Sequence, residues 1–160
     1  MDGIVIAPVG TADIPLLDAA LRQLATDLND RYTADQATLA AAVCGPGADC
    51  LALLATRNGS PMGAVLAAPV FSTMRGGAGL YVSDLWVTES VRGKGLARRL
   101  LASALQHGTQ RNAGHFLKLT VYRDNPGARA AYDRLGFTGQ PDETNMTLTG
   151  PALENLKERP

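Results

Sequence analysis

The sequence lacks the features that mark several large classes of protein. Its 15 Lys and Arg residues balance 15 Asp and Glu residues, so the formal net charge of zero gives no electrostatic basis for binding nucleic acid or an anionic membrane. Its apolar stretches fall far short of the ~20 residues that cross a bilayer. The first residues lack the basic region and apolar stretch of a signal peptide. We therefore expect a soluble, cytoplasmic protein.

Cysteine and histidine are also scarce, with two residues of each. Cys44 and Cys50 flank a Gly-Pro-Gly turn, which is compatible with a local disulfide or half of a metal site. His107 and His115 lie far from them in the sequence and complete no ligand cluster. We expect no metal site, and unpaired structural thiols in a reducing compartment.

The remaining composition is that of an ordinary globular chain. Hydrophobic residues make up 46% and charged residues 19% of 160 positions, enough for one domain with a buried core. No repeat or interdomain linker interrupts the sequence. We expect one domain over residues 1–150 and a tail over 151–160 that is a short helix or frayed.

Apolar periodicity and turn residues predict an alternation of strands and helices. The predicted order is a strand at 4–6, a helix at 14–28, a helix at 36–43 opened by a capping box at 33–36, strands at 51–57, 62–71 and 80–87, a helix ending near residue 108, a strand at 115–122, a helix at 125–135 and a weaker strand at 144–149. The three middle strands form an antiparallel meander with an Asn-Gly turn. One helix separates the strands at 80–87 and 115–122, so these two should be parallel neighbours in a mixed α/β sheet.

A glycine-containing loop, residues 92–97, lies between a predicted strand and a predicted helix. Gly93 and Gly95 allow close approach of a ligand, and backbone N–H groups converge at the start of a helix. Arg98 and Arg99 add positive charge. The loop therefore suits a phosphate or pyrophosphate, although a purely structural turn uses glycine in the same way.

Two common phosphate-binding motifs do not fit this loop. A Walker loop requires Ser or Thr directly after Gly93-Lys94, where Gly95 stands, and a glycine five positions before Gly93, which is absent. A dinucleotide fingerprint requires a third glycine at the position of Arg98 and an acidic residue where His115 lies. Both motifs are excluded.

Three blocks of sequence resemble the GNAT superfamily of N-acetyltransferases. Arg92, Gly95 and Ala97 match its central Gln/Arg-x-x-Gly-x-Gly/Ala motif, and the segment 84–87 resembles the strand before it. A second signature is matched by Val121, Tyr122, Arg123, Asp124, Asn125, Ala128, Tyr132, Leu135, Gly136 and Phe137. The resemblance covers residues 50–140. It implies an α/β (α+β) fold with a mixed, mostly antiparallel sheet of six to seven strands, about four flanking helices, and central parallel strands that splay apart.

The resemblance also implies a binding site for acetyl-CoA. In this family the pantetheine arm lies between the splayed strands and the pyrophosphate lies on the loop, and an N–H near Leu85 polarises the thioester carbonyl. The implied cofactor-binding residues are Leu85, Trp86, Val87, Arg92, Gly93, Lys94, Gly95, Leu96, Ala97, Arg98, Lys118, Leu119, Thr120 and Asn125.

Two residues match positions that carry proton transfer in the family. Tyr132 corresponds to a tyrosine that acts as general acid toward the departing thiolate; alternatively, it is an amphipathic tyrosine at the core edge. Asp84 lies where relatives often carry the base, and a buried carboxylate there would have a raised pKa. Alternatively, Asp84 has a structural role and forms a hydrogen bond with the neighbouring backbone.

These residues lead to a primary hypothesis and two alternatives. The hypothesis is an N-acetyltransferase that acts on a primary amine of a small molecule, either polyamine-like or amino-acid-like, by direct attack on the thioester. The layout is similar to the diamine and spermidine N-acetyltransferases, but Ser83-Asp84 replaces their adjacent Glu-Asp. The alternatives are acetylation of a protein N-terminus or lysine, and a non-catalytic domain that binds acyl-CoA and regulates a partner. The resemblance is also compatible with a homodimer.

Two groups of residues could shape the acceptor site. Asp27, Asp30 and Asp35 would either contribute to a polycation site or form a solvated face. Aromatic side chains could wall the pocket: Tyr32, Phe71, Tyr81 and Trp86, the last of which would equally suit the core.

Overall fold

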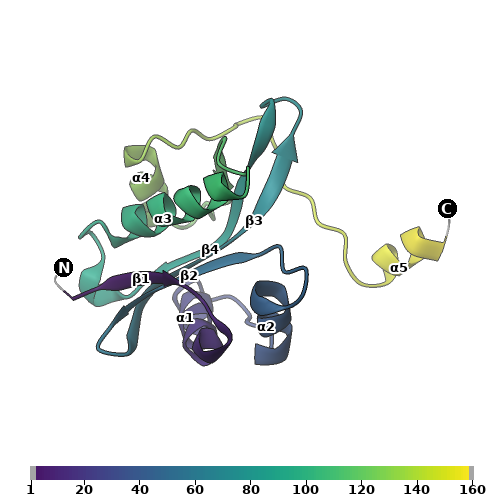
Figure 1. Cartoon of the computed structure of the whole chain (residues 1–160). Helices are drawn as coiled ribbons and strands as arrows, with labels where there is room; N and C mark the ends of the chain where they lie inside the picture. Colours follow the sequence, from purple (N-terminus) through teal and green to yellow (C-terminus); the bar gives the residue numbers. More distant parts are fainter. Residues whose placement is uncertain (1–2, 159–160) are drawn as a thin grey trace. The chain divides into compact units, whose positions relative to one another are not determined.

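The computed structural model describes residues 3–158 and divides the chain into two compact units, residues 1–122 and 123–160. The first unit contains one five-stranded sheet in the order β1-β2-β3-β4-β5 (Figure 1). Its strands are β1 Val5–Pro8, β2 Leu51–Arg57, β3 Ser60–Ser72, β4 Gly77–Val87 and β5 Leu117–Leu119. Neighbours from β1 to β4 are antiparallel, whereas β4 and β5 are parallel, which confirms the predicted meander and mixed sheet.

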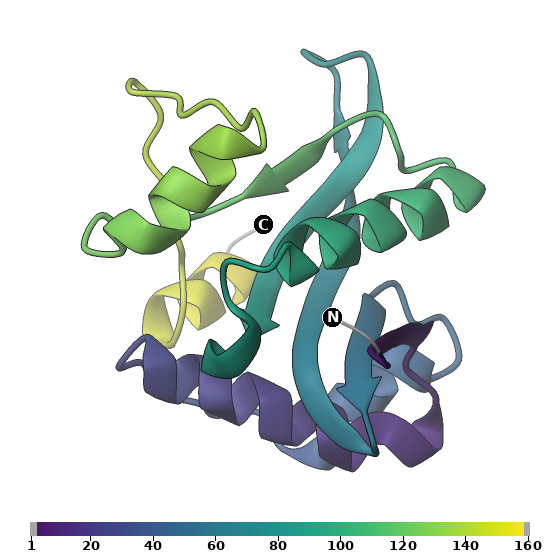
Figure 2. The same cartoon turned by 90° about the vertical axis from the view of Figure 1, so that its left-hand side faces the viewer.

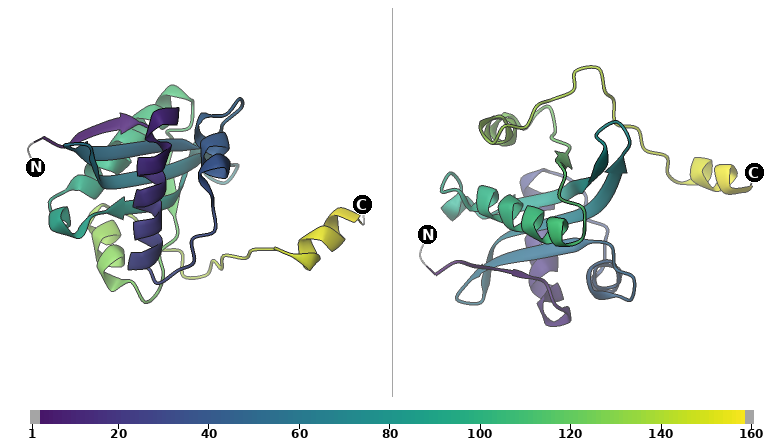
Figure 3. Two further views of the ribbon diagram at one scale, coloured as in Figure 1. Left: turned by 90° about the horizontal axis from the view of Figure 1, so that it is seen from below. Right: turned by 45° about the horizontal axis from the view of Figure 1, so that its top comes forward.

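Helices cover both faces of this sheet. α1 (Ile14–Asp27) and α2 (Gln36–Cys44) lie on one face, and α3 (Leu96–Gln110) lies on the other (Figure 2). Two short 3-10 helices precede α1 and α3, at Thr11–Asp13 and Glu89–Val91. Seen from below, α1 crosses the strands of the sheet (Figure 3, left). Both faces of the sheet are thereby shielded from solvent. The strand sequences are therefore continuous apolar runs and do not alternate strictly between apolar and polar residues.

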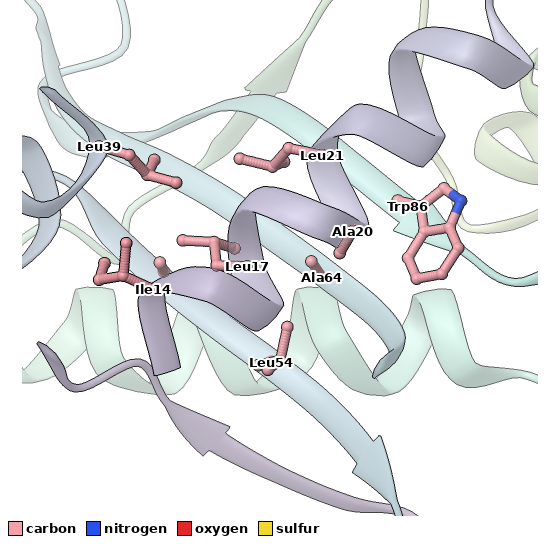
Figure 4. Close-up of a cluster of buried hydrophobic side chains, with 9 residues drawn as sticks. Ile14, Leu17, Ala20, Leu21, Leu39, Leu54, Ala64 and Trp86 are labelled. Carbon is pink, nitrogen blue, oxygen red and sulfur yellow. The ribbon is translucent and has the colours of Figure 1, made fainter. Parts of the chain in front are cut away.

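The core beneath α1 and α2 fixes the position of β4. Leu17 and Ala64 are fully buried in it, and Trp86 of β4 is 5% exposed (Figure 4). The other members of this cluster are Ile14, Ala20, Leu21, Leu39, Ala52 and Leu54. Because side chains alternate along a strand, Leu53 and Val65 point to the opposite face, where Leu96 and Leu100 of α3 are also fully buried.

The second unit contains α4 (Pro126–Arg134) and α5 (Pro151–Glu158). Asn125 caps α4, its Oδ1 accepting a hydrogen bond from the N–H of Ala128 at 3.0 Å. The helix ends before Gly136, as predicted. The N–H of Phe137 donates to the carbonyl of Tyr132 at 3.0 Å, and the two rings meet edge to face with centroids 5.6 Å apart. The second family signature therefore spans one structural unit: it begins at the residue that caps α4 and ends where the helix has stopped.

The structure corrects several predicted elements. Residues 144–149 form no strand, and five strands replace the predicted six to seven over the described part of the chain. The two apolar residues of that segment, Met146 and Leu148, are 92% and 48% exposed, so alternation there buries little. β5 is shorter than the predicted 115–122 because its pairing with β4 stops at Leu119.

Helix boundaries also differ from the prediction. The cap of α2 is Asp35, whose Oδ1 accepts from the N–H of Thr38 at 2.7 Å, rather than a box opened by Thr33. α3 continues past Gly108, which is a packing residue because a Cβ there would lie 2.7 Å from Leu80 Cδ1. The tail is helical from Pro151 to Glu158; its last two residues, 159 and 160, lie outside the described range, as do the first two residues of the chain. Between residues 3 and 158, no helix combines the length and apolarity that a membrane span requires.

Candidate functional site

The two parallel strands of the first unit part after a short contact. β4 pairs with β5 only from Leu80 to Val82, opposite Leu117 to Leu119. β4 then continues to Val87, and within the described sheet its only neighbour over that stretch is β3. This separation matches the predicted splay and leaves one edge of β4, over residues 83–87, open.

A β-bulge lies where the strands part. Leu66 of β3 pairs with Asp84, but the next residue, Ala67, pairs with Val82, so Ser83 is the extra residue of β4. The Ser83 hydroxyl donates to the carbonyl of Leu66 at 3.2 Å. A bulge of this kind bends a strand and changes which residues face each side, so it sets the orientation of every residue from 84 to 87.

The register determines which backbone groups face the open edge. The N–H of Thr88 donates to the carbonyl of Met62 at 3.0 Å, which continues the β3–β4 ladder. Because hydrogen-bonded pairs alternate in an antiparallel ladder, Trp86 also directs its backbone to β3, whereas Leu85 and Val87 direct theirs away from it. The carbonyl of Val87 accepts a hydrogen bond from Arg92 Nε at 2.9 Å.

The glycine loop leads from β4 into α3 with its backbone open. Gly93 and Gly95 have φ of 74° and 83°, and a Cβ on either would meet nothing within 4 Å. Among residues 3–158 no acceptor binds the loop and first-turn N–H groups of Gly93, Gly95, Leu96, Ala97 and Arg98. Unpaired N–H groups at a helix start carry partial positive charge, so this position suits an anion.

Positive side chains surround this loop, but two of them are already engaged. Lys94 Nζ donates to the carbonyl of Ser90 at 2.9 Å, and Arg92 is held by Val87 and by Asp27. Arg98 is exposed at the start of α3.

Asp27, the last residue of α1, brings three elements together. Its Oδ2 accepts hydrogen bonds from Trp86 Nε1 at 3.1 Å and from Arg92 Nη2, and its Oδ1 accepts from Gln23 Nε2 at 3.0 Å. Burial opposes ionisation, but these hydrogen bonds and the Arg92 charge outweigh it and lower the pKa of Asp27. No local sequence pattern indicates this link, because Asp27 and Arg92 are far apart in the chain.

Asp84 lies on the same face of the sheet as Trp86, two residues away, and therefore on the side of α1 and α2. Burial raises the pKa of this carboxyl above its usual 3.8, although a hydrogen bond from Ser83 acts in the opposite direction. The Asp84 charge also contributes to the raised pKa of Tyr32, which places the two side chains within electrostatic reach of each other.

A buried polar cluster supports Tyr32. Asp18 is 5% exposed and accepts hydrogen bonds from Tyr32 Oη at 2.8 Å, Arg22 Nε at 2.9 Å and Gln36 Nε2 at 3.3 Å. The Arg22 guanidinium lies 4.5 Å from the centroid of the Tyr32 ring. Burial and Asp18 together raise the pKa of Tyr32 to about 12. Sequence reasoning missed this cluster; an acid beside the apolar stripe of α1, four residues before an arginine, was its only signal.

The chain beyond β5 contacts the segment between α1 and α2. Tyr122 Oη donates to Asp30 Oδ2 at 2.7 Å, and Tyr81 and Thr120 hydroxyls lie 3.3 Å apart. Of the predicted cofactor residues on this strand, Lys118 and Thr120 are exposed and Leu119 is partly buried. Within the first unit, the predicted residues thus lie on β4, the loop that follows it, the first turn of α3, and β5 with the residue after it.

The aromatic residues and aspartates that were candidates for the acceptor site do not gather in one place. Phe71 pairs with Ala78, near the end of β3 that is far from the pairing of Gly63 with Val87. Trp86 belongs to the core cluster, against which Tyr32 also packs. The three aspartates are exposed, as the solvated-face alternative expected, but each is engaged by another group of the protein. Asp27 binds Arg92, Asp30 binds Tyr122, and Asp35 caps α2.

The predicted residues of the second unit share one helix. Asn125 uses its side-chain oxygen as the cap of α4, and Tyr132 lies two turns further on. Burial raises the pKa of Tyr132, which keeps its phenol protonated at neutral pH.

Cys44 and Cys50 are both free thiols, as expected. No three His, Cys, Asp or Glu side chains in the described residues are placed to hold a metal ion.

Comparisons with known proteins identify a family and a fold. The family model described as "Acetyltransferase (GNAT) family" matches residues 18–137. N-alpha-acetyltransferase 40 of Saccharomyces cerevisiae is 40% identical over 78 residues; that match covers 43% of this chain and only 27% of the yeast protein.

Solved structures of similar fold cover nearly the whole chain. An integron cassette protein from the mobile metagenome of V. cholerae has a TM-score of 0.76 at 19% identity, covering 99% of both chains. An aminoglycoside acetyltransferase from an uncultured soil metagenomic sample, in complex with sisomicin, has a TM-score of 0.75 at 13% identity, covering 92% of this chain and 97% of that one. Ribosomal-protein-alanine N-acetyltransferase from Brucella melitensis biovar Abortus 2308 has a TM-score of 0.71 at 19% identity, covering 91% and 99%.

The raised pKa of Asp84 leads to a prediction about stability. Between the usual and the raised pKa, the folded state retains a proton that the unfolded state has released, so stability falls as the pH rises through this window. Asp84→Asn should therefore unfold at higher urea concentration than the native protein at about pH 7, and the difference should shrink toward about pH 4. The exposed residue Asp49 supplies the control, Asp49→Asn. A variant at position 84 that is less stable at neutral pH would contradict this account.

Proposed function

Because the chain belongs to the acetyltransferase (GNAT) family, we propose that it is an enzyme that transfers an acetyl group from acetyl-CoA to a primary amine. The observation that carries this proposal is the juxtaposition of two open backbone surfaces at one end of β4. The first is the edge at Leu85 and Val87, and the second is the start of α3.

The open surfaces fit the two polar parts of coenzyme A. The amide groups of a pantetheine arm would pair with the backbone of Leu85 and Val87, while Trp86 holds the strand to β3 and to the core. The N–H groups of Gly93, Gly95, Leu96, Ala97 and Arg98 would bind the pyrophosphate. Lys118, Leu119 and Thr120 would line the side of β5, and Asn125 would contact the amide region. Bound acetyl-CoA supplies an acetyl group already activated as a thioester.

Asp84 is the proposed base. A primary amine is mostly protonated at neutral pH and must lose a proton before it can attack a carbonyl carbon. A carboxylate whose pKa is raised by burial is a stronger proton acceptor than an exposed one. Asp84 precedes Leu85, whose N–H faces the open edge and would polarise the carbonyl under attack.

Tyr132 is the proposed general acid. Its assignment rests on the family signature that runs from Asn125 to Phe137 and on its chemistry: a phenol that stays protonated at neutral pH can donate a proton to a departing thiolate.

The acceptor is proposed to be a small molecule with one or few ammonium groups. Asp27, Asp30 and Asp35 are each engaged within the protein, which leaves Asp84 as the carboxylate beside the open edge of β4 and supports this choice over a polycation. The 40% identity to the yeast N-alpha-acetyltransferase supports a second candidate, a peptide N-terminus. The late strands of this family are compatible with a homodimer, which we retain as a proposal, together with a cytoplasmic location.

A thiol-release assay with acetyl-CoA and a panel of amines tests the function. The panel contains an amino acid, spermidine, sisomicin and short peptides with free N-termini. Amine-dependent thiol release establishes acetyl transfer, and the order of kcat/KM over the panel identifies the acceptor class. Binding of coenzyme A by calorimetry without turnover of any amine would instead indicate a non-catalytic binding domain.

The cofactor loop can be tested with a matched pair of glycine variants. Gly95→Ala places a side chain at φ 83°, a strain of about 1–2 kcal/mol, so coenzyme A should bind roughly 5- to 30-fold more weakly. Gly59→Ala imposes similar strain at φ 76° in the β2–β3 turn and should leave the Kd unchanged. Equal affinities of the two variants would argue against the loop as the pyrophosphate site.

The role of Tyr132 can be tested on the best amine of the panel. Tyr132→Phe removes the phenolic proton but keeps the ring against Phe137, so kcat should fall roughly 100-fold with little change in the Kd for coenzyme A. Asp133→Asn, an exposed change on the same helix that removes an ion pair with Arg129, is the control and should retain most of its activity. If kcat of Tyr132→Phe equals that of the native protein at every pH, Tyr132 is not the general acid.

A further inference from the structure

Asp27 occupies a position where an acidic residue is unfavourable for its own helix. It is the last residue of α1, and the carboxyl end of a helix carries partial negative charge that repels a carboxylate. The side chain is also only 27% exposed. Other interactions must therefore stabilise the ionised form, and they come from Gln23, Trp86 and Arg92.

The same side chain joins the cofactor loop to β4. Arg92, the first residue of the loop, donates through Nε to the carbonyl of Val87 at 2.9 Å and through Nη2 to Asp27. Trp86 shares the Oδ2 atom that Arg92 uses. A guanidinium held at both ends in this way has one preferred geometry, because its donors are fixed in a plane.

Asp27 also begins the segment on the acceptor side, residues 28–35, which we name the α1–α2 segment. This segment has two further anchors in the first unit: Asp30 accepts from Tyr122, and Tyr32 donates to Asp18. Tyr32 lies within electrostatic reach of Asp84. The segment therefore extends from the residue that holds Arg92 to Tyr32, which packs against the core cluster that contains Trp86.

We propose that Asp27 is a positioning residue that couples occupation of the cofactor loop to the order of the α1–α2 segment. The inference rests on the proposed function. A ligand paired with the open edge at Val87 competes with or redirects the Arg92 hydrogen bond to that carbonyl, and Arg92 transmits the change through the ion pair with Asp27. Asp27 is covalently continuous with the segment that flanks Asp84, so cofactor binding orders the acceptor side before the amine arrives.

Charge is the component of this link that a single variant can remove. Asp27→Asn keeps the size of the side chain and one oxygen, which can accept from Trp86, while its NH2 group faces Gln23, whose own amide can turn to present its oxygen. It removes the negative charge that pairs with Arg92. The indole hydrogen bond and the core around Trp86 are retained, so a purely structural role for Asp27 predicts little effect from this substitution on the response to ligand.

Hydrogen exchange measured by mass spectrometry tests the coupling, with coenzyme A as the probe at a concentration that saturates each variant. In the native protein, coenzyme A should slow exchange of the amides in residues 28–35 by about tenfold. In Asp27→Asn this protection should be absent, while protection of residues 93–98 remains. Asp35→Asn is the matched control: it neutralises an acid in the same segment, retains a capping side chain for α2 and should respond like the native protein.

A second variant covers the case in which Asp27→Asn fails to fold. Arg92→Gln removes the other half of the ion pair and should also abolish protection of residues 28–35 at saturating coenzyme A. Protection of the segment in either variant equal to that in the native protein would overturn the inference, as would coenzyme A binding to the native protein without any protection of the segment. Absence of coenzyme A binding to the native protein would overturn the proposed function as well.

Discussion

The separation of β4 from β5 after Val82 is the constraint on which the rest of the site depends. A strand inside a sheet has its hydrogen-bonding groups satisfied on both sides, so it can bind nothing through its backbone. Parting the parallel strands leaves the backbone of Leu85 and Val87 without a strand partner on that side, and the bulge at Ser83 determines that these residues, and not Asp84 and Trp86, face the opening. The same bulge turns Asp84 and Trp86 toward α1 and α2. One inserted residue thus directs the backbone of Leu85 and Val87 to the open edge and the side chains of Asp84 and Trp86 to the face covered by α1 and α2.

Charges around this opening are arranged so that most of them are neutralised within the protein. Asp18 is paired with Arg22, and Asp27 with Arg92, and each of these acids has a lowered pKa in spite of burial. Asp84 is the contrasting case, because burial raises its pKa and hydrogen bonding to Ser83 only partly offsets this. A carboxyl group kept in such surroundings reduces stability at neutral pH, which is a common property of residues retained for chemistry rather than for folding.

Much of the fold could be predicted from local sequence patterns. The helices α1 and α3 and the turn between β2 and β3 are determined by residues close together in the chain, namely an apolar stripe or a turn dipeptide. The family motifs placed the glycine loop correctly between β4 and α3. Links between distant segments were not accessible in this way: the approach of Asp27 to Arg92, and of Tyr122 to Asp30, depends on how the elements pack. Alternation also misled the prediction at 144–149, where Met146 and Leu148 stay exposed. An alternating pattern of apolar and polar residues shows only that one face of a segment could be buried. Whether that face is buried depends on a partner surface elsewhere in the fold.

Backbone amide resonances of the first unit provide the most direct measurement of the central claim, that the open edge of β4 binds the donor. In a titration of isotope-labelled protein with coenzyme A, followed by two-dimensional NMR, the amides of Leu85 and Val87 should shift and become protected from solvent exchange. The amide of Trp86, already paired with β3, should remain protected throughout. Binding of coenzyme A that leaves the Leu85 and Val87 amides unshifted and unprotected would contradict the account.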